Sequence, residues 1–142
     1  MPMIDVYAPA GTFKARHQLA QDVARAVMRW EQVPEISLFA DNTVAFVHDL
    51  SPGATATASG RGDGVRVEVL TPAGALDRDK QLGVVKELTD IVAAAAGDPT
   101  LAERTWVLIT EAPNGGWGIA GHAYTHADIA AAAKAALLAD GG

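Results

Sequence analysis

The chain has 142 residues, of which 49% are hydrophobic and 20% are charged, and its formal net charge at pH 7 is −6. This length suits a single domain, residues 1–142, that is large enough to bury a core. The negative charge argues against a nucleic-acid or anionic-membrane partner, and the absence of cysteine excludes disulfides, thiolate catalysis and thiol-ligated metals.

The first part of the chain has the pattern of a strand, a helix and a second strand. Residues 3–7 alternate apolar and polar side chains, as a strand with one buried face does. After a Pro-Ala-Gly turn at 9–11, three- and four-residue spacings predict a helix through Leu19, Val23, Ala26, Val27 and Trp30. A second strand is predicted at 43–49, and the segment 51–64, rich in Gly, Ala, Ser and Thr, predicts a loop.

The second part of the chain repeats this order. A strand is predicted at 65–70, a second Pro-Ala-Gly turn occupies 72–74, and another strand is predicted at 105–111. Between the turn and the last strand, helical spacing is shown by Val84, Val85, Leu88, Ile91 and Val92. The alanine-rich stretch 126–138 predicts a further helix at the end of the chain.

The repeat predicts the fold class. A strand–helix–strand crossover joins two parallel neighbouring strands with a right-handed connection. Two tandem β-α-β units, residues 1–60 and 61–142, therefore predict an α/β (α+β) fold with a four-stranded sheet and both helices on one face. The open face of that sheet must be covered by other chains or by the tail.

Neither a membrane-spanning segment nor a signal peptide is predicted from the sequence. No segment reaches the roughly 18 uninterrupted apolar residues of a membrane span. The amino terminus lacks the basic stretch and long apolar run of a signal peptide. We therefore expect no membrane partner and a cytoplasmic protein.

Two segments resemble the tautomerase superfamily. Met1-Pro2-Met3-Ile4-Asp5-Val6 places a proline at the start of the first strand, where members of that family carry an amino-terminal proline. The stretch 107–121, with Trp117-Gly118-Ile119, is similar to the end of a 4-oxalocrotonate tautomerase subunit. The whole chain resembles two fused units, as in the malonate semialdehyde decarboxylase and cis-3-chloroacrylic acid dehalogenase groups. The resemblance implies a cofactor-independent enzyme that acts on a small molecule and assembles as a homotrimer.

Pro2 is the predicted catalytic residue. Proline is a small second residue, so we expect the removal of Met1, which leaves a secondary amine. A free α-amino group has a pKa of about 8, and an apolar pocket lowers that value. A neutral amine near the working pH is an efficient general base, which can move a proton next to a carbonyl. The alternative is an ordinary chain start that keeps Met1.

The arginines of the relatives are missing, so the substrate-binding residues must differ. Thr71-Pro72-Ala73-Gly74 stands where the decarboxylase and dehalogenase groups carry paired arginines. As candidates we take Arg61 from the loop, Trp117 as the aromatic matching the family pocket, Trp106 on a strand and His48 at a strand end. Each also has a structural interpretation: a solvated charge, subunit packing, core and a polar cap, respectively.

Other chemistries are weaker. His122, Tyr124, His126 and Asp128 invite a metal interpretation, but they share one face only in an extended segment, and no metal is predicted. Among the alternatives, the same proline serves a decarboxylase- or hydratase-like lyase, or the chain is a non-enzymatic binding member of the family. The main hypothesis is a tautomerase with Pro2 as general base on a small keto, enol or unsaturated acid substrate.

Overall fold

The computed structural model of this chain describes residues 1–140, so the last two residues of the predicted second unit lie outside it. The first unit contains β1 (Met3–Pro9), α1 (Arg16–Glu31), the short α2 (Ser37–Ala40) and β2 (Val44–Leu50). The second contains β3 (Val65–Pro72), α3 (Arg78–Ala96), the 3-10 helix η1 (Pro99–Arg104) and β4 (Thr105–Ala112). A hairpin of β5 (Trp117–Ile119) and β6 (His122–Tyr124) and the helix α4 (His126–Asp140) complete the chain.

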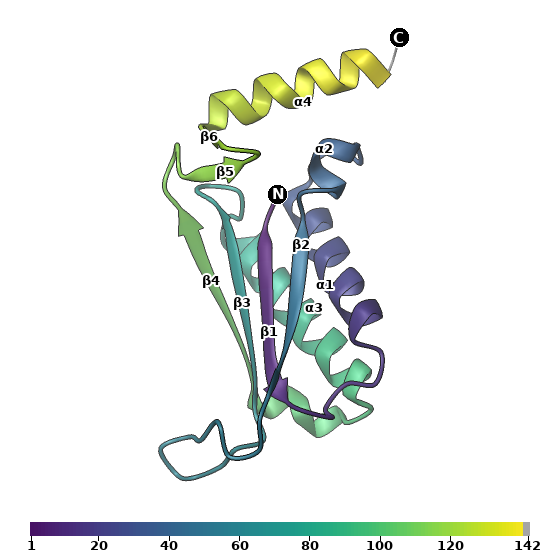
Figure 1. Ribbon diagram of the computed structural model, residues 1–142, viewed down its shortest axis with the longest axis vertical. Helices are drawn as coiled ribbons and strands as arrows, with labels where there is room; N and C mark the ends of the chain where they lie inside the picture. The colour runs from purple at the N-terminus through teal and green to yellow at the C-terminus, as the bar shows by residue number, and fades with distance from the viewer. Residues whose placement is uncertain (141–142) are drawn as a thin grey trace.

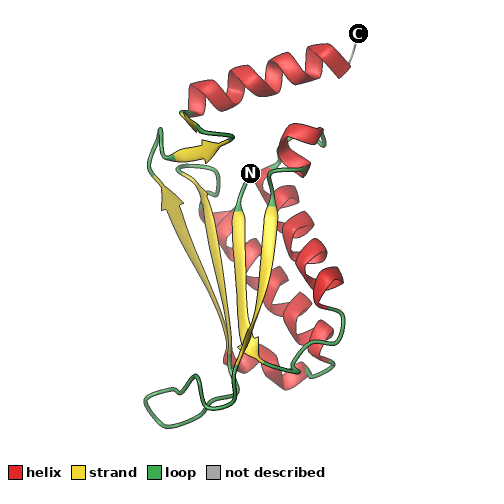
Figure 2. Cartoon of the chain, viewed as in Figure 1, coloured by secondary structure: helices red, strands yellow, loops and turns green. Residues whose placement is uncertain are grey.

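The four long strands form one sheet in the order β2-β1-β3-β4. Strands are parallel within each unit, Met3 opposite Val44 and Val65 opposite Thr105, whereas β1 and β3 are antiparallel. Helices α1 and α3 lie side by side on one face of the sheet, and the other face carries no helix (Figures 1 and 2). The predicted fold, two β-α-β units with both helices on one face, is confirmed.

Alternation along the strands separates the core from the open face. In β1, Ile4 and Val6 are fully buried between sheet and helices, while Asp5 and Tyr7 face the other way. The helices contribute a matching apolar stripe with four-residue spacing. Its fully buried members are Leu19, Val23 and Val27 in α1 and Val84, Leu88 and Val92 in α3.

The two Pro-Ala-Gly triplets make equivalent turns. The amide of Ala10 donates to the carbonyl of Leu50 at 2.9 Å, and that of Ala73 donates to Ala112 at 3.2 Å. The glycines that follow, Gly11 and Gly74, have φ angles of 88° and 79°, a region that glycine enters without steric cost. Because β1 and β3 are antiparallel, these two turns lie at opposite ends of the sheet.

The carboxy-terminal part lies beyond the sheet, near the amino terminus. Helix α4, predicted over 126–138, is confirmed and extends to Asp140. It lies across the end of the sheet from which the chain starts, above the β5–β6 hairpin, and leaves the open face of the sheet uncovered (Figure 1). No helix within residues 1–140 is both long enough and apolar enough to cross a membrane.

Candidate functional site

Pro2 is buried at the end of the sheet where β1 begins. Its carbonyl accepts a hydrogen bond from the amide of Val44 at 3.2 Å, and the next residue, Met3, pairs with Val44 on β2 and Leu70 on β3. The start of the chain is therefore held between a neighbouring strand on each side.

The terminal amine contacts a buried carboxylate. In the structure the Met1 ammonium donates to Oε1 of Glu31 at 2.8 Å, and both side chains are 1% exposed. Oε2 of the same carboxylate accepts from the hydroxyl of Thr71 at 2.7 Å. Because Met1 and Pro2 are adjacent, removal of Met1 moves the amine by about one residue, ~3.8 Å between Cα atoms. The contact with Glu31 is therefore shown for the amine of Met1.

This polar pair is present at only one of the two repeat-related ends of the sheet. Glu31 is the last residue of α1 and precedes a left-handed residue, as Ala96 does at the end of α3. Thr71 precedes the turn proline of unit two, as Ala8 does in unit one. Unit two therefore has alanine where unit one has the carboxylate. A carboxylate at a helix carboxyl end is also disfavoured by the helix dipole, so its position is not explained by helix stability.

A cavity of about 310 Å³ lies beside this pair. Its wall is formed mostly by apolar side chains and by the turn after β3. The lining residues are Met1, Glu31, Val33, Phe39, residues 72–75, His126, Ile129 and Ala130. Among the described residues, Glu31 and His126 are the only ionisable side chains in this lining, and no lysine or arginine belongs to it. The site is a small, largely apolar cavity with one carboxylate and one imidazole.

Trp117 is the predicted substrate-binding residue that the structure brings to the amino terminus. It is 6% exposed and belongs to the same packed cluster as Met1, Ile36, Phe39 and Ala112. Its ring therefore supports the wall of the cavity rather than lining it. The sequence signal for this placement is the Trp-Gly-Ile segment after β4.

His48 and Trp106 lie toward the other end of the open sheet face. His48 is opposite Tyr7, with which it stacks at 4.4 Å, and its Nε2 is 2.7 Å from Oδ1 of Asp5. Trp106 is opposite Arg66 at the start of β4 and is 47% exposed. Neither lines the cavity beside Pro2.

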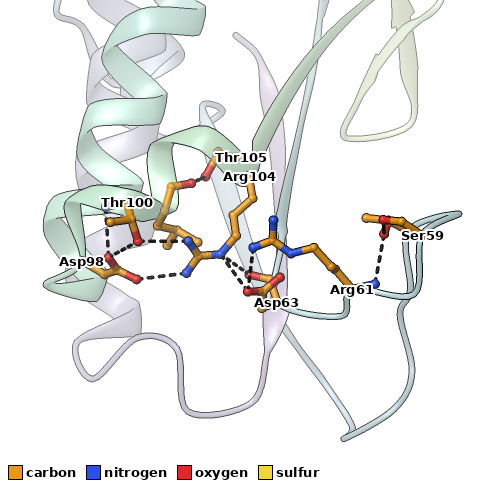
Figure 3. A network of polar contacts seen from close by, with 9 residues as sticks. Ser59, Arg61, Asp63, Asp98, Thr100, Arg104 and Thr105 are labelled. Atoms are coloured by element: carbon orange, nitrogen blue, oxygen red, sulfur yellow. Dashed lines mark hydrogen bonds and ion pairs between the residues drawn. The ribbon is translucent and has the colours of Figure 1, made fainter.

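Arg61 also lies away from the terminal amine. It stands in the loop between β2 and β3, at the end of the molecule opposite the amino terminus (Figure 1). Its guanidinium pairs with Asp63 at 3.3 Å, within a network that continues through Arg104 to Asp98 (Figure 3). Hydrogen bonds from Thr100 and Arg104 lower the pKa of Asp98. These contacts give Arg61 a role in ordering the loop.

His126 is a site residue that the sequence analysis placed only in a weak metal hypothesis. It is the first residue of α4, and its backbone amide donates to Oδ1 of Asn114 at 2.8 Å. Thr125 and Asp128 form a reciprocal cap, with Thr125 N to Asp128 Oδ2 at 3.0 Å and Asp128 N to Thr125 Oγ1 at 3.1 Å. The cap fixes the start of α4 and so holds His126 at the cavity. Within the described part of the chain, no three His, Asp or Glu side chains are arranged to hold a metal.

The fold has close counterparts among solved structures, although no family profile and no curated protein sequence matches the chain. A member of the cis-3-chloroacrylic acid dehalogenase family is 20% identical with a TM-score of 0.72, over 86% of this chain and 82% of its own. A fused 4-OT protein, described as a symmetric trimer, is 16% identical with a TM-score of 0.73, over 89% and 98%. Malonate semialdehyde decarboxylase is 17% identical with a TM-score of 0.62, over 82% and 89%.

These similarities confirm the fold expected from the sequence resemblance. The counterparts are tautomerase superfamily proteins, and each is covered over most of its length. This chain therefore has the fold of that superfamily in its fused, two-unit form. At such identities the likeness concerns the fold, and the chemistry must be argued from the residues of this chain.

Proposed function

We propose that this chain is a cofactor-independent tautomerase in which Pro2, freed by removal of Met1, is the general base. The observation that carries the proposal is the buried start of the chain, where the Met1 amine, whose place the Pro2 amine would take, lies 2.8 Å from the Glu31 carboxylate on the wall of an apolar cavity. Removal of Met1 also vacates the space of a side chain that lines this cavity. A small keto or enol substrate then has access to the secondary amine.

The proposed reaction consists of two proton transfers, one from the substrate to Pro2 and one from Pro2 back to the substrate. Pro2 N takes a proton from the carbon next to the substrate carbonyl, and the electron pair of the broken C–H bond moves to the carbonyl oxygen. The ammonium that forms is stabilised by the neighbouring Glu31 carboxylate, which Thr71 holds in place. Return of the proton to a different atom completes the isomerisation. The imidazole of His126 is the group in the cavity that is suited to hydrogen-bond the enolate oxygen.

Two measurements test this proposal. Mass spectrometry of the intact protein should show the loss of Met1, since retained Met1 blocks the Pro2 nitrogen with a peptide bond. Exchange of the α-protons of phenylpyruvate and phenylacetone with D2O, followed by NMR, then reports the proton-transfer step. We expect Pro2→Ala to lower the exchange rate about 10- to 100-fold, part of the roughly 10²–10⁴-fold that a general base contributes.

The variant retains a small second residue, so Met1 is removed from it as well, and the comparison is between a secondary and a primary amine. Equal rates for the two proteins on both compounds, or retained Met1 in the wild type, would overturn the proposal.

A further inference from the structure

The charge of the cavity points to the class of substrate. Glu31 is a buried carboxylate whose only described partners are the terminal ammonium and the Thr71 hydroxyl. A buried carboxylate repels a second carboxylate strongly, because the low local dielectric screens little of the repulsion. None of the described residues of the cavity lining is a lysine or arginine that would offset this repulsion.

We infer that this site selects uncharged carbonyl compounds over carboxylates, and that Glu31 is the residue that determines this selectivity. The inference rests on the proposed function, since it takes the Pro2 amine to lie beside Glu31 in the mature chain. While Pro2 acts as a base its nitrogen is uncharged, and the described lining has no lysine or arginine to bind a substrate carboxylate beside Glu31. An uncharged ketone or aldehyde brings no charge that must be compensated.

The remaining lining fits such a ligand. Val33, Phe39 and Ile129 offer apolar contacts, and the volume of about 310 Å³ lies at the small end of the range for ligand pockets, roughly 300–1,000 Å³. The backbone amides of the turn after β3 are already used: Ala73 donates to Ala112, Gly74 to Glu111 and Ala75 to Pro72. They therefore do not form an anion-binding nest.

The asymmetry of the repeat supports the same assignment. The repeat-related positions at the other end of the sheet are alanines: Ala8 of unit one is buried in the main apolar core, and Ala96 of unit two packs against that core. Buried positions are usually apolar, so a hydrogen-bonded carboxylate in one unit, where the other unit has alanine, is an exception to that tendency. Such departures are expected at functional sites.

The test compares the binding of two ligands that differ in one group. Phenylacetone carries a methyl ketone where phenylacetate carries a carboxylate, and both are titrated against the intact-mass-verified protein while the amide NMR signals of His126 and Ile129 are followed. The titrations are made at about pH 8, above the range in which histidine usually titrates. We expect phenylacetone to bind at least about tenfold more tightly than phenylacetate, as the repulsion between two carboxylates requires.

The variant Glu31→Gln keeps the shape and removes the charge, so it should reduce this preference about tenfold by strengthening the binding of phenylacetate. Glu35→Gln, which removes an exposed carboxylate from the same loop region, should leave the preference unchanged. Equal or tighter binding of phenylacetate to the wild type would overturn the inference, even if Glu31→Gln fails to fold. An unchanged preference in folded Glu31→Gln would overturn it as well.

Binding does not require turnover, so the two proposals fail separately. Loss of the Pro2 effect on proton exchange, with the ligand preference intact, contradicts the proposed tautomerase activity alone. A preference for phenylacetate, with Pro2-dependent exchange intact, contradicts the assignment of the substrate class alone.

Discussion

At the scale of single residues, the hydroxyl of the strand residue Thr71 donates a hydrogen bond to the carboxylate of Glu31. It is fully buried and donates at 2.7 Å to a carboxylate that is itself buried. The variant Thr71→Val keeps the shape and removes the donor, leaving Oε2 of Glu31 without its partner. Hydrogen bonds to charged groups contribute about 1.5–3 kcal/mol, and we expect the free energy of unfolding in urea to fall by about that amount.

Thr89→Val is the matched control for this change. The Thr89 hydroxyl donates to the carbonyl of Val85 on its own helix at 2.7 Å, at an exposed position. Surface substitutions of this kind change stability by no more than about 0.5 kcal/mol. Equal losses in the two variants would show that the Thr71 hydroxyl does not support Glu31.

The sequence analysis proposed Pro2 as the general base but did not single out Glu31. A glutamate at a helix end is usually solvated, and its burial here depends on the packing of α1 against the end of β3. One signal was present: Leu19, Val23, Val27 and Glu31 follow one another at four-residue intervals, so Glu31 continues the buried stripe.

The position of His48, away from the cavity at the amino terminus, has a different origin. The second strand of a β-α-β unit runs parallel to the first, so a residue near its end lies far from the start of the first strand. This separation follows from the predicted parallel pairing of the two strands. His48 accordingly lies opposite Tyr7 rather than beside Pro2. Arg61 follows the same strand and lies further still from the amine, whereas Trp117 reaches it because β4 ends beside the end of β3.

At the scale of the helices, α1 and α3 approach each other at Gly83. A β-carbon added there would meet the ring of Trp30 at 2.2 Å, and this ring is held by a 2.8 Å hydrogen bond from its Nε1 to Glu87. Gly83→Ala improves helix propensity by about 1 kcal/mol, but overpacking costs about 1–3 kcal/mol. We expect a net loss of stability in thermal unfolding.

A double-mutant cycle checks the cause. In the Trp30→Leu background the obstructing ring is gone, so the same Gly83→Ala change should become neutral or stabilising. If Gly83→Ala is stabilising in the presence of Trp30, or equally damaging without it, the close approach of the two helices is not the reason.

The cap of α4 should depend on pH. Hydrogen bonds from the backbone and then the side chain of Thr125, followed by the proximity of His122, lower the pKa of Asp128. Because the pKa in the folded state lies below the ordinary value of about 3.9, the stabilising effect is complete above about pH 4. It is lost as the pH falls further, through the pKa of the folded state.

The carboxyl carbon of Asp128, followed by NMR during acid titration, should therefore show its midpoint below about 3.9. In Thr125→Ala, which removes the side-chain part of the cap, the midpoint should move up toward that value. A wild-type midpoint at or above the ordinary value contradicts the described cap.

The long elements were predictable because periodicity extends over several turns or residue pairs. Strands of seven or eight residues and helices of 16 and 19 residues show their alternation or their apolar stripe clearly. The β5–β6 hairpin and α2 were not predicted, because segments of three or four residues are too short to show a period. The position of α4 depends on contacts with Met1 and the hairpin, which the sequence does not reveal.

At the scale of the whole molecule, the sheet is covered on one face only. The two units share one sheet and one core, and on this basis we propose that they unfold as a single domain. The open face carries four large apolar side chains at 39–50% exposure: Phe46, Leu70, Trp106 and Leu108. Helix α4, the predicted alternative cover, lies across the end of the sheet instead (Figure 1). An apolar face of this kind is usually buried by a second copy of the chain.

A symmetric trimer is described for a fused 4-OT protein of the same fold, and we propose a homotrimer here as well, for which sedimentation or light scattering should give three times the chain mass of 14.7 kDa. Leu108 lies on β4, where it is 47% exposed on the open face. Its replacement in Leu108→Glu places a charge in a contact that excludes water, which should shift the assembly to monomers. Leu82→Glu is the control, since Leu82 is 53% exposed on α3, on the side of the helices away from the open face. A wild-type mass of one chain contradicts the assembly, and dissociation caused equally by Leu82→Glu would place the contact on the helices instead.

Because β1 is an interior strand whose alternate residues face the open side, assembly there would also restrict the start of β1 and so the orientation of Pro2.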